Sequence, residues 1–265
     1  MQTKVHNHGF VQLVDTMPRE NIDASIVQAA RVSYGDGTSS SRSNEGLIRY
    51  LLRHWHTTPF EMVEFKFHLK MPIFVARQHL RHRMASVNEM SARYSVIPNE
   101  FYVPDEYRKQ SQVNKQGSEG VLVDDALVEP QKISDASFEI YDKLLSTGCC
   151  RELARCHLPQ STYTEFYWKI NLHNLMHYLQ LRMEVGAQQE IRDYARAIYD
   201  LVAPLAPLTM KAFMDFRINT VQLSGPEIEL IKSGLPCTED KINNSTISIG
   251  ERREFIEKLK KLGLF

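Results

Sequence analysis

The sequence contains little of what marks several large classes of protein. Four of its 265 residues are cysteine, 11 are proline and 12 are glycine, which excludes a disulfide-rich scaffold and a collagen-like repeat. Its 32 basic and 32 acidic residues cancel, whereas proteins that bind nucleic acid through bulk electrostatics are usually basic. Any anionic ligand must therefore meet a local cluster of positive charge.

Neither a targeting signal nor a membrane span is indicated. Residues 1–15 contain no long apolar run behind a basic region, so they do not resemble a signal peptide. No stretch approaches the roughly 18 uncharged apolar residues of a membrane span. We therefore expect a cytoplasmic protein that binds neither a membrane nor nucleic acid.

The remaining composition is typical of a folded globular protein. Hydrophobic residues make up 43% and charged residues 24%, which excludes disorder as the main state. The length suits one large domain or two small ones. Adjacent Cys149 and Cys150 fit neither a CxxC redox pair nor a zinc knuckle. We expect them, with Cys156 and Cys237, to be buried free thiols without a nucleophilic role.

The periodicity predicts an α+β fold. Strands and helices alternate without the regular rhythm of βαβ units. The clearest strand spans residues 63–70, where apolar and charged residues alternate, so it is half-buried and antiparallel to its neighbours. Further strands are expected at 10–14, 101–103 and 162–168. Helices are expected at 23–31, 47–55, 73–83, 133–145, 151–157, 171–183, 187–202, 208–216, 226–232 and 251–262.

Three polar stretches are predicted to lie outside these elements. Residues 36–43 form a polar loop, and residues 84–95 have no clean period and are expected to be a structured loop. Residues 105–130 are polar and uneven, which indicates a flexible insertion.

The densest set of polar residues runs from Arg77 to Arg93. Arg77 and Arg81 are four residues apart, so they would share one face of a helix that extends to residue 83. With Arg83 and Arg93, these seventeen residues contain four arginines. Glu89 is the only acidic residue among them. Guanidinium groups suit bidentate contact with phosphate. The segment is therefore either a phosphate or nucleotide site, or a solvated basic helix face.

A second set of polar residues lies on the helix predicted at 171–183. His173 and His177 are four residues apart, as zinc-binding histidines can be, but the glutamate of HExxH is missing and no nearby cysteine or carboxylate completes a set. We therefore expect no metal, and the alternative is a pair of helix histidines bonded to backbone or solvent. Arg182 follows on a largely apolar helix, where it either extends its charge to solvent or ends a ligand pocket.

The motifs of the best-known nucleotide sites and hydrolases do not occur. The sequence lacks the GxGxxG of a Rossmann site, the GxxxxGK[ST] of a P-loop and the GxSxG of a nucleophile elbow. The histidine pair His54 and His56 suits a helix C-terminus. The arginine pair Arg151 and Arg155 suits an ordinary surface pair.

One motif does resemble a known family. Residues 81–93 match the RHRxxSxxExSxR signature of the flavin-dependent (alternative) thymidylate synthases at seven fixed positions over thirteen residues. Similar segments are GFVQLVD at 9–15, AARVS at 29–33, HxTPFE at 56–61, PIFVARQ at 72–78, RELAR at 151–155 with Pro159, and NLHNLMH at 171–177 with residues 181–182. The resemblance covers about residues 9–202.

The resemblance implies an FAD enzyme that methylates dUMP to dTMP. The carbon would come from 5,10-methylenetetrahydrofolate and the reducing equivalents from NADPH. The flavin would deliver a hydride to the uracil ring, and the methylene would reach the pyrimidine without an enzyme thioether. The family forms homotetramers whose sites combine several subunits, around a central mixed or antiparallel sheet with flanking helices. Residues 1–216 would form this domain and residues 217–265 a helical extension.

The resemblance also implies roles for individual residues. Arg182 would stabilise an ionised uracil N3, and Ser91 would orient the uracil rather than attack it. Positions matching dUMP contacts are Gln78, Arg81, Glu89, Ser91, Arg93, Arg155 and Arg182. Positions matching FAD contacts are His56, Thr58, Arg81, His82, Arg83, Glu89, Asn171, His173 and His177.

Three competing interpretations use the same residues. The arginines could bind nucleotides or RNA without catalysis, although no RNP-type aromatic motif accompanies them. The histidines could hold a metal. A family member could also keep FAD after losing synthase activity, although every signature position is intact.

Overall fold

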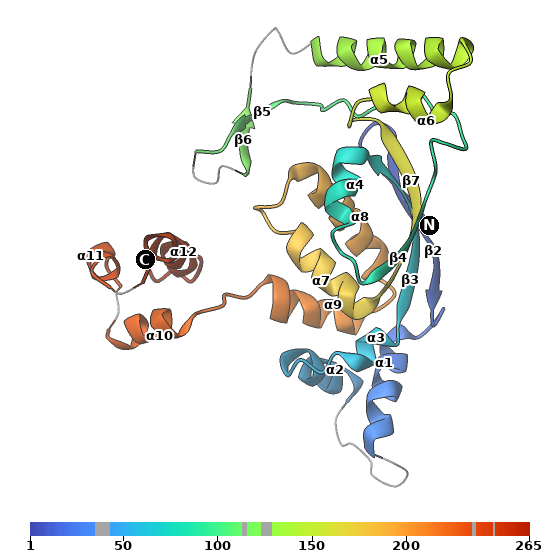
Figure 1. Ribbon diagram of the computed structural model, residues 1–265. Coiled ribbons are helices and arrows are strands. Elements are labelled where there is room, and N and C mark those ends of the chain that lie inside the picture. The colour runs from blue at the N-terminus through green and yellow to red at the C-terminus, as the bar shows by residue number, and fades with distance from the viewer. Residues whose placement is uncertain (35–42, 113–115, 123–128, 235–236, 246) are drawn as a thin grey trace. The chain divides into compact units, whose positions relative to one another are not determined.

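The computed structural model describes residues 1–34, 43–112, 116–122, 129–234, 237–245 and 247–265, so the loop predicted at 36–43 lies mostly outside the described residues. The described chain divides into two compact units, residues 1–213 and 214–265 (Figure 1). No helix of the described residues is both long enough and apolar enough to cross a bilayer.

The first unit is built on a five-stranded antiparallel sheet, which confirms the expected α+β fold. The strand order is β1-β2-β3-β7-β4, and every neighbouring pair is antiparallel. The strands are β1 Gln2–Val5, β2 Gly9–Met17, β3 Glu64–Pro72, β7 Tyr163–Asn171 and β4 Ala85–Glu89.

Strand β3 lies at the centre of the sheet because one of its faces is apolar. Phe65, Phe67 and Leu69 are fully buried, while Lys66 between them is exposed. Phe67 lies opposite Trp168 of β7, also fully buried. Burial of one such side chain stabilises the fold by about 1.5–3 kcal/mol, so the predicted alternation fixes which face of the sheet meets the core.

Helices cover this apolar face and extend the unit at one end. Helices α4 Ile73–His79, α7 Leu172–Arg182 and α8 Gln189–Val202 contact the sheet strands (Figure 1). Beyond β3, α1 Ile22–Arg31, η1 Val32–Tyr34, α2 Asn44–Arg53, α3 Thr58–Glu61 and α9 Pro207–Phe213 pack together. Helix α3 also contacts α7, which places this group beside the start of that helix.

Two expectations around the arginine-rich segment were wrong. Helix α4 ends at His79 rather than at residue 83, with Leu80 as its C-cap, so Arg77 and Arg81 do not share a helix face. Residues 85–89, predicted to be a loop, form strand β4 on the edge of the sheet beside β7. Four of its five residues are exposed, so no buried face imposed the alternation that predicts a strand.

The other end of the unit carries the insertion and two further helices. Part of the stretch predicted to be flexible forms an antiparallel hairpin of β5 Arg108–Gln110 and β6 Ser118–Val121. Helices α5 Glu129–Ser146 and α6 Arg151–Ala154, with η3 Arg155–His157, follow. The strand predicted at 101–103 is reduced to one bridge between Phe101 and Thr162. Phe101 packs instead in a small separate core with Phe138 and Tyr141.

The cysteines differ from the expectation of buried thiols. All four are free, but Cys150 and Cys156 are exposed and Cys149 is partly exposed. These three lie beside α5 and α6, where the small core leaves much of the surface open. Cys237 alone of the four is buried.

The second unit has a small apolar core of its own. It begins with the π-helix η4 Met214–Ile218 and continues with α10 Gly225–Lys232, α11 Glu239–Asn243 and α12 Ile249–Lys261. Phe255 and Leu259 of α12 pack on Ile242 and Cys237. Lys258 pairs with buried Glu227 at 2.9 Å. Helices α10 and α12 match predicted ones, whereas α11 was not expected.

Candidate active site

The ends of α4 and α7 meet in a group of bonded polar side chains, which we call the Arg182 cluster. It consists of Gln78, His79, His82, Tyr178 and Arg182. The Nε–H of Arg182 donates to Nε2 of His82 at 3.0 Å, and its Nη2 donates to the backbone oxygen of Gln78 at 3.2 Å. Two contacts from elements about a hundred residues apart in sequence therefore fix one guanidinium in place.

The contact with Arg182 determines the proton position on His82. A guanidinium can only donate, so Nε2 of His82 must carry a lone pair and the ring proton must sit on Nδ1. Burial, helped by the positive charge of Arg182 and by His177, lowers the pKa of His82 from 6.5 to about 4. His82 is therefore neutral at physiological pH and accepts from Arg182 without repelling the guanidinium.

His79 forms the buried base of the cluster. Its Nδ1 lies 3.0 Å from the hydroxyl of Tyr178, and its ring packs against Trp168 with centroids 4.3 Å apart. Complete burial lowers its pKa to about 3, with smaller contributions from His82 and Arg182. Nε2 of His79 finds no hydrogen-bond partner among the described residues. His79 is thus a neutral, buried side chain that packs with Tyr178 and Trp168 next to His82 and Arg182.

Strand β4 and the loop after it carry the predicted nucleotide contacts. The hydroxyl of Thr164 donates to Oε1 of Glu89 at 2.6 Å, which ties that carboxylate to the neighbouring strand. The hydroxyl oxygen of Ser91 accepts from the backbone amide of Arg93 at 3.3 Å. An adjacent base is what makes a serine nucleophilic, and the hydrogen bonds found for Ser91 in the described residues provide none.

Arginines flank this strand in the sequence, and a further one lies in η3. Arg81 and Arg83 are exposed in the turn after α4, and Arg155 lies in η3. Arg93 pairs with Glu152 at 3.1 Å, but both side chains are more than half exposed. Such a surface pair contributes about 0–1 kcal/mol, so a phosphate could displace Glu152 from Arg93 at little cost. These arginines are candidates for the local cluster that an anionic ligand of a neutral protein requires.

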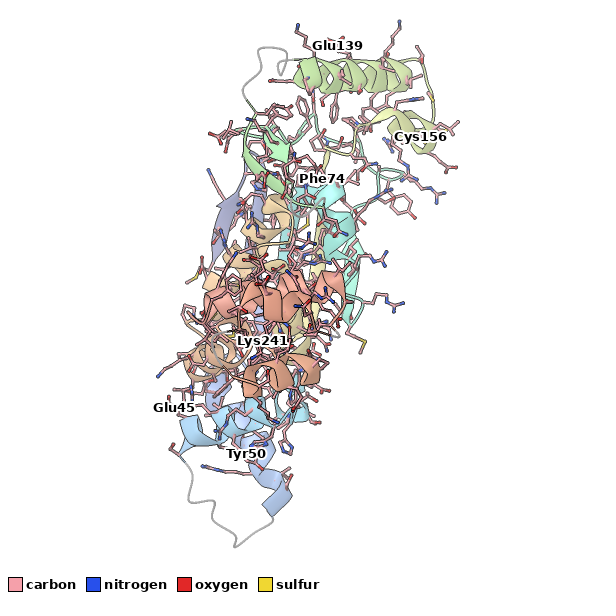
Figure 2. All side chains as sticks on the ribbon, turned by 90° about the vertical axis from the view of Figure 1, so that its left-hand side faces the viewer. Glu45, Tyr50, Phe74, Glu139, Cys156 and Lys241 are labelled. Atoms are coloured by element: carbon pink, nitrogen blue, oxygen red, sulfur yellow. The ribbon has the colours of Figure 1, made fainter. Side chains whose placement is uncertain are left out.

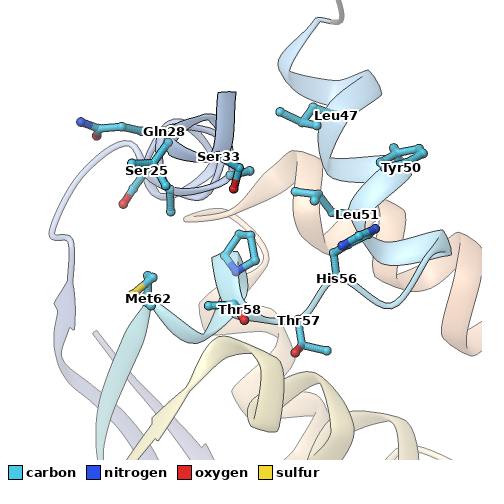
Figure 3. A pocket seen from close by; sticks show the side chains of 14 residues that line it. Ser25, Gln28, Ser33, Leu47, Tyr50, Leu51, His56, Thr57, Thr58 and Met62 are labelled. Carbon is cyan, nitrogen blue, oxygen red and sulfur yellow. The ribbon is translucent and has the colours of Figure 1, made fainter. Parts of the chain in front are cut away.

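A cavity of about 840 Å³ lies between α1, α2 and α3 (Figure 3). Two predicted FAD contacts, His56 and Thr58, line it, and the His56 ring stacks with Tyr50 at a centroid distance of 5.8 Å. Its wall combines apolar and polar side chains, namely Ser25, Gln28, Ala29, Ala30, Val32, Ser33, Leu47, Leu51, Thr57, Pro59 and Met62. An apolar cavity with a few polar groups suits a planar cofactor, so these residues fit part of an FAD molecule.

The start of α7 carries the remaining predicted FAD contacts. Asn171 caps the helix, and its Oδ1 accepts from the backbone and side-chain nitrogens of Asn174, both at 2.9 Å. Its NH₂ group keeps donor capacity for a ligand. His177 lies one turn beyond His173, and its ring centroid is 6.0 Å from that of His82. No group of three histidine, cysteine or acidic residues able to hold a metal occurs in the described residues.

The structure thus groups the predicted residues in three places. Gln78, His82, His177 and Arg182 lie together at the ends of α4 and α7. His56 and Thr58 line the cavity. Glu89 ends β4, and Ser91 and Arg93 follow it. The sequence did not reveal His79 or Tyr178, which support the Arg182 cluster from below. Aromatic and histidine residues in apolar stretches carry no sequence signal that distinguishes such a support from ordinary core.

Comparisons with known proteins identify the family of the chain. Residues 12–208 match the model of the family described as thymidylate synthase complementing protein. The chain is 50% identical to the flavin-dependent thymidylate synthase of Dictyostelium discoideum, over 98% of this chain and 87% of that protein. It is 49% identical to the protein of the same name from Thermus thermophilus, over 96% of this chain and 94% of that protein.

A solved structure shares the fold of most of the chain. The UMP/dUMP methylase PolB from Streptomyces cacaoi, bound with 5-Br UMP, superposes with a TM-score of 0.71. It is 36% identical and covers 81% of this chain and 97% of its own. By the family model, the identity to these relatives and the shared fold, the chain belongs to the flavin-dependent thymidylate synthase family.

Proposed function

We propose that the chain binds FAD and methylates dUMP to dTMP. The carbon donor is 5,10-methylenetetrahydrofolate and the reductant is NADPH, and no enzyme cysteine takes part. The observation that carries the proposal is the guanidinium of Arg182, held by a neutral histidine and a backbone carbonyl beside the signature segment. Family membership supplies the reaction, and this guanidinium supplies a group suited to it.

Arg182 would stabilise the pyrimidine as an anion. A guanidinium stays protonated at all working pH values and favours the ionised form of a neighbouring uracil N3. Two of its five N–H groups donate to other described residues, and relative to these residues three remain to meet a ligand. Because His82 is neutral, it positions the guanidinium without adding a second charge that binding would have to desolvate.

The nucleotide's phosphate would lie against the exposed arginines near β4. Arg93 and Arg155 supply charge, and Arg81 faces the nucleotide from the turn after α4. Ser91 and Glu89 follow on the same segment, where Ser91 orients the base through hydrogen bonds. These roles agree with the local concentration of guanidinium groups in a protein without net charge.

FAD would be held by His56 and Thr58 in the cavity and by Asn171, His173 and His177 on α7, with His82, Arg83, Arg81 and Glu89 from the signature segment. When bound, the flavin would supply hydride transfer. The chain's own contribution is to bind and orient. The neutral rings near Arg182 also limit water access, since Tyr178 and His79 are buried beneath it.

The proposed absence of a thiol step is supported by the contacts of the Arg182 cluster, because no hydrogen bond found for it among the described residues involves a cysteine. Cys149, Cys150 and Cys156 belong to the end of the first unit formed by α5 and α6. Figure 2 shows Cys156 at the opposite end of that unit from Tyr50, which lines the cavity. A thiolate able to attack the pyrimidine would have to lie beside Arg182.

We further propose that the enzyme is a cytoplasmic homotetramer with shared sites. His56 lines the cavity between α1, α2 and α3, whereas the Arg182 cluster lies at the ends of α4 and α7 of the same chain. A second copy would bring one group against the other and would cover exposed apolar residues such as Met84 and Tyr94. Cross-linking or light scattering of the FAD-loaded protein measures the subunit number.

An omission assay tests the proposed reaction. Purified protein with FAD, dUMP, NADPH and methylenetetrahydrofolate should form dTMP, detected by mass. Omission of dUMP, NADPH or methylenetetrahydrofolate, or removal of FAD from the protein beforehand, should abolish the product. Product formed without NADPH, or with a folate lacking the methylene group, would contradict the proposal. RNA binding without any dTMP would instead favour the non-catalytic interpretation.

A further inference from the structure

A buried carboxylate lies close to the Arg182 cluster and has no role in the site described so far. Glu190, in the first turn of α8, is 3% exposed. Its Oε1 accepts from the hydroxyl of Tyr102 at 3.0 Å and from Nη2 of Arg108 at 2.6 Å. Its Oε2 accepts from the side-chain amide of Gln188 at 2.8 Å. Arg108 belongs to β5, so the insertion hairpin is joined to α8 at this point.

The network continues from Gln188 into the Arg182 cluster. The side-chain Oε1 of Gln188 accepts from Nε2 of Gln78 at 2.5 Å. The backbone oxygen of Gln78 accepts in turn from Arg182. A continuous series of hydrogen bonds therefore runs from Arg108 through Glu190 and Gln188 to Gln78.

Glu190 is ionised, which gives this series a direction. Its burial favours the neutral acid, but the hydrogen bonds from Arg108, its own amide and Gln188, with the charge of Arg108, together hold the pKa of Glu190 below its usual range. A carboxylate only accepts hydrogen bonds. Gln188 must therefore turn its NH₂ toward Glu190, so its carbonyl oxygen faces Gln78.

The same logic fixes the orientation of Gln78. The oxygen of Gln188 can only accept, so Gln78 must present its NH₂ group to it. This leaves the carbonyl oxygen of Gln78 and its second N–H for a ligand. Without the carboxylate, the two amides could both rotate by 180° and present the opposite groups at similar energy.

We propose that Glu190 and Gln188 are positioning residues that set the amide orientation of Gln78 and thereby tune the affinity for the pyrimidine nucleotide. The proposal rests on the function proposed above, in which Gln78 contacts dUMP. It extends the site to the insertion hairpin, because Arg108 balances the charge of Glu190. In this proposal, neither Glu190 nor Gln188 touches the reacting atoms.

A double-mutant cycle on the FAD-loaded enzyme tests this role. The dissociation constant of dUMP is measured by calorimetry for the wild type, Glu190→Gln, Gln78→Ala and the combined variant. We expect about 3- to 10-fold weaker binding for Glu190→Gln and about tenfold for Gln78→Ala. The combined variant should be no weaker than Gln78→Ala alone, because Glu190 acts through Gln78. Glu184→Gln, an exposed carboxylate in the preceding loop, serves as the matched control and should bind as the wild type does.

Gln188→Ala repeats the cycle without leaving a buried charge unpaired. It tests the relay even if Glu190→Gln does not fold, since Gln188 is exposed. Additive losses in either cycle, or unchanged dUMP affinity in Gln188→Ala, would overturn the inference while the wild type still binds FAD and dUMP. A wild type that binds neither would sink the proposed function, and this inference with it.

Discussion

The Arg182 cluster and the cavity between α1, α2 and α3 are prepared for their ligands in different ways. In the cluster, side-chain and backbone contacts fix one guanidinium and one neutral histidine before any ligand arrives. The cavity instead offers about 840 Å³ of mixed apolar and polar wall. The first arrangement suits a small charged group whose position decides reactivity. The second suits a large planar group held by contact area.

The largest expected effect comes from a substitution in the Arg182 cluster, whose guanidinium is already fixed in place. Arg182→Ala should lower kcat/KM for dUMP by at least about 100-fold, as loss of a preorganised charge donor does. It should keep FAD, because the cavity is unchanged. Steady-state turnover and the flavin absorbance of the same sample measure both. Arg196→Ala, an exposed arginine on α8, is the control. Wild-type turnover in Arg182→Ala would remove this residue from the site.

A smaller effect is expected from a substitution in the cavity between α1, α2 and α3. His56→Ala should weaken FAD binding by about 3- to 10-fold, which corresponds to the loss of one polar or stacking contact. The enzyme saturated with FAD should then turn over nearly as the wild type does. Flavin fluorescence titration measures the affinity. His54→Ala, at the same helix end but outside the cavity wall, should bind FAD normally. Equal losses in both variants would contradict the assignment of this cavity to FAD.

A pH series tests whether buried His79 of the Arg182 cluster is held neutral in the folded protein. His79 and His82 have pKa values of about 3 and about 4, below the ordinary 6.5. Between pH 6.5 and 3 the unfolded chain therefore binds more protons, and the free energy of unfolding falls as the pH falls. His79→Asn keeps a partner for the Tyr178 hydroxyl but does not titrate.

The Tm of His79→Asn should be lower than that of the wild type at pH 7, because the smaller side chain leaves space in the core. Its decline between pH 6.5 and 4 should be shallower. Differential scanning calorimetry of both proteins gives the two slopes. His157→Asn, at an exposed histidine, should keep the wild-type slope. Parallel curves for His79→Asn and the wild type would show that His79 is not held neutral.

The smallest effect should come from the cysteines. Cys149→Ala, Cys150→Ala, Cys156→Ala and Cys237→Ala should each retain turnover within about twofold, as substitutions away from a site do. The dTMP assay on the four FAD-loaded variants measures this. A variant that binds FAD but forms no dTMP would show that a thiol takes part.

The sequence predicted the central elements because their burial is one-sided. Strand β3 alternates between fully buried Phe67 and exposed Lys66, and that period of two is visible in the residues themselves. Strand β4 was missed because it lies on the edge of the sheet and exposes most of its residues. The helix at 73–83 was predicted too long, since polar residues such as Arg81 and Arg83 are compatible with a helix until the chain turns at Leu80.

The site could be predicted only as far as local motifs reach. The signature segment identified His82 and Arg93, and the similar segment at 72–78 identified Gln78. Nothing in these segments indicates that Arg182 donates to His82 a hundred residues earlier in the chain. The hydrogen bonds from Glu190 join residues as far apart as Gln78 and Gln188, and Gln188 and Glu190 look like ordinary surface residues in the sequence. Contacts of this kind are set by tertiary packing, to which local sequence patterns are blind.

The most direct measurement is the visible absorption spectrum of the purified protein, before and after NADPH is added without oxygen. Flavin bands that bleach on NADPH, and that shift when dUMP is added to a separate oxidised sample, are the result expected for an FAD site beside a pyrimidine site. A protein that stays colourless after incubation with FAD would contradict the proposed function and would leave the arginines near β4 as a general anion site.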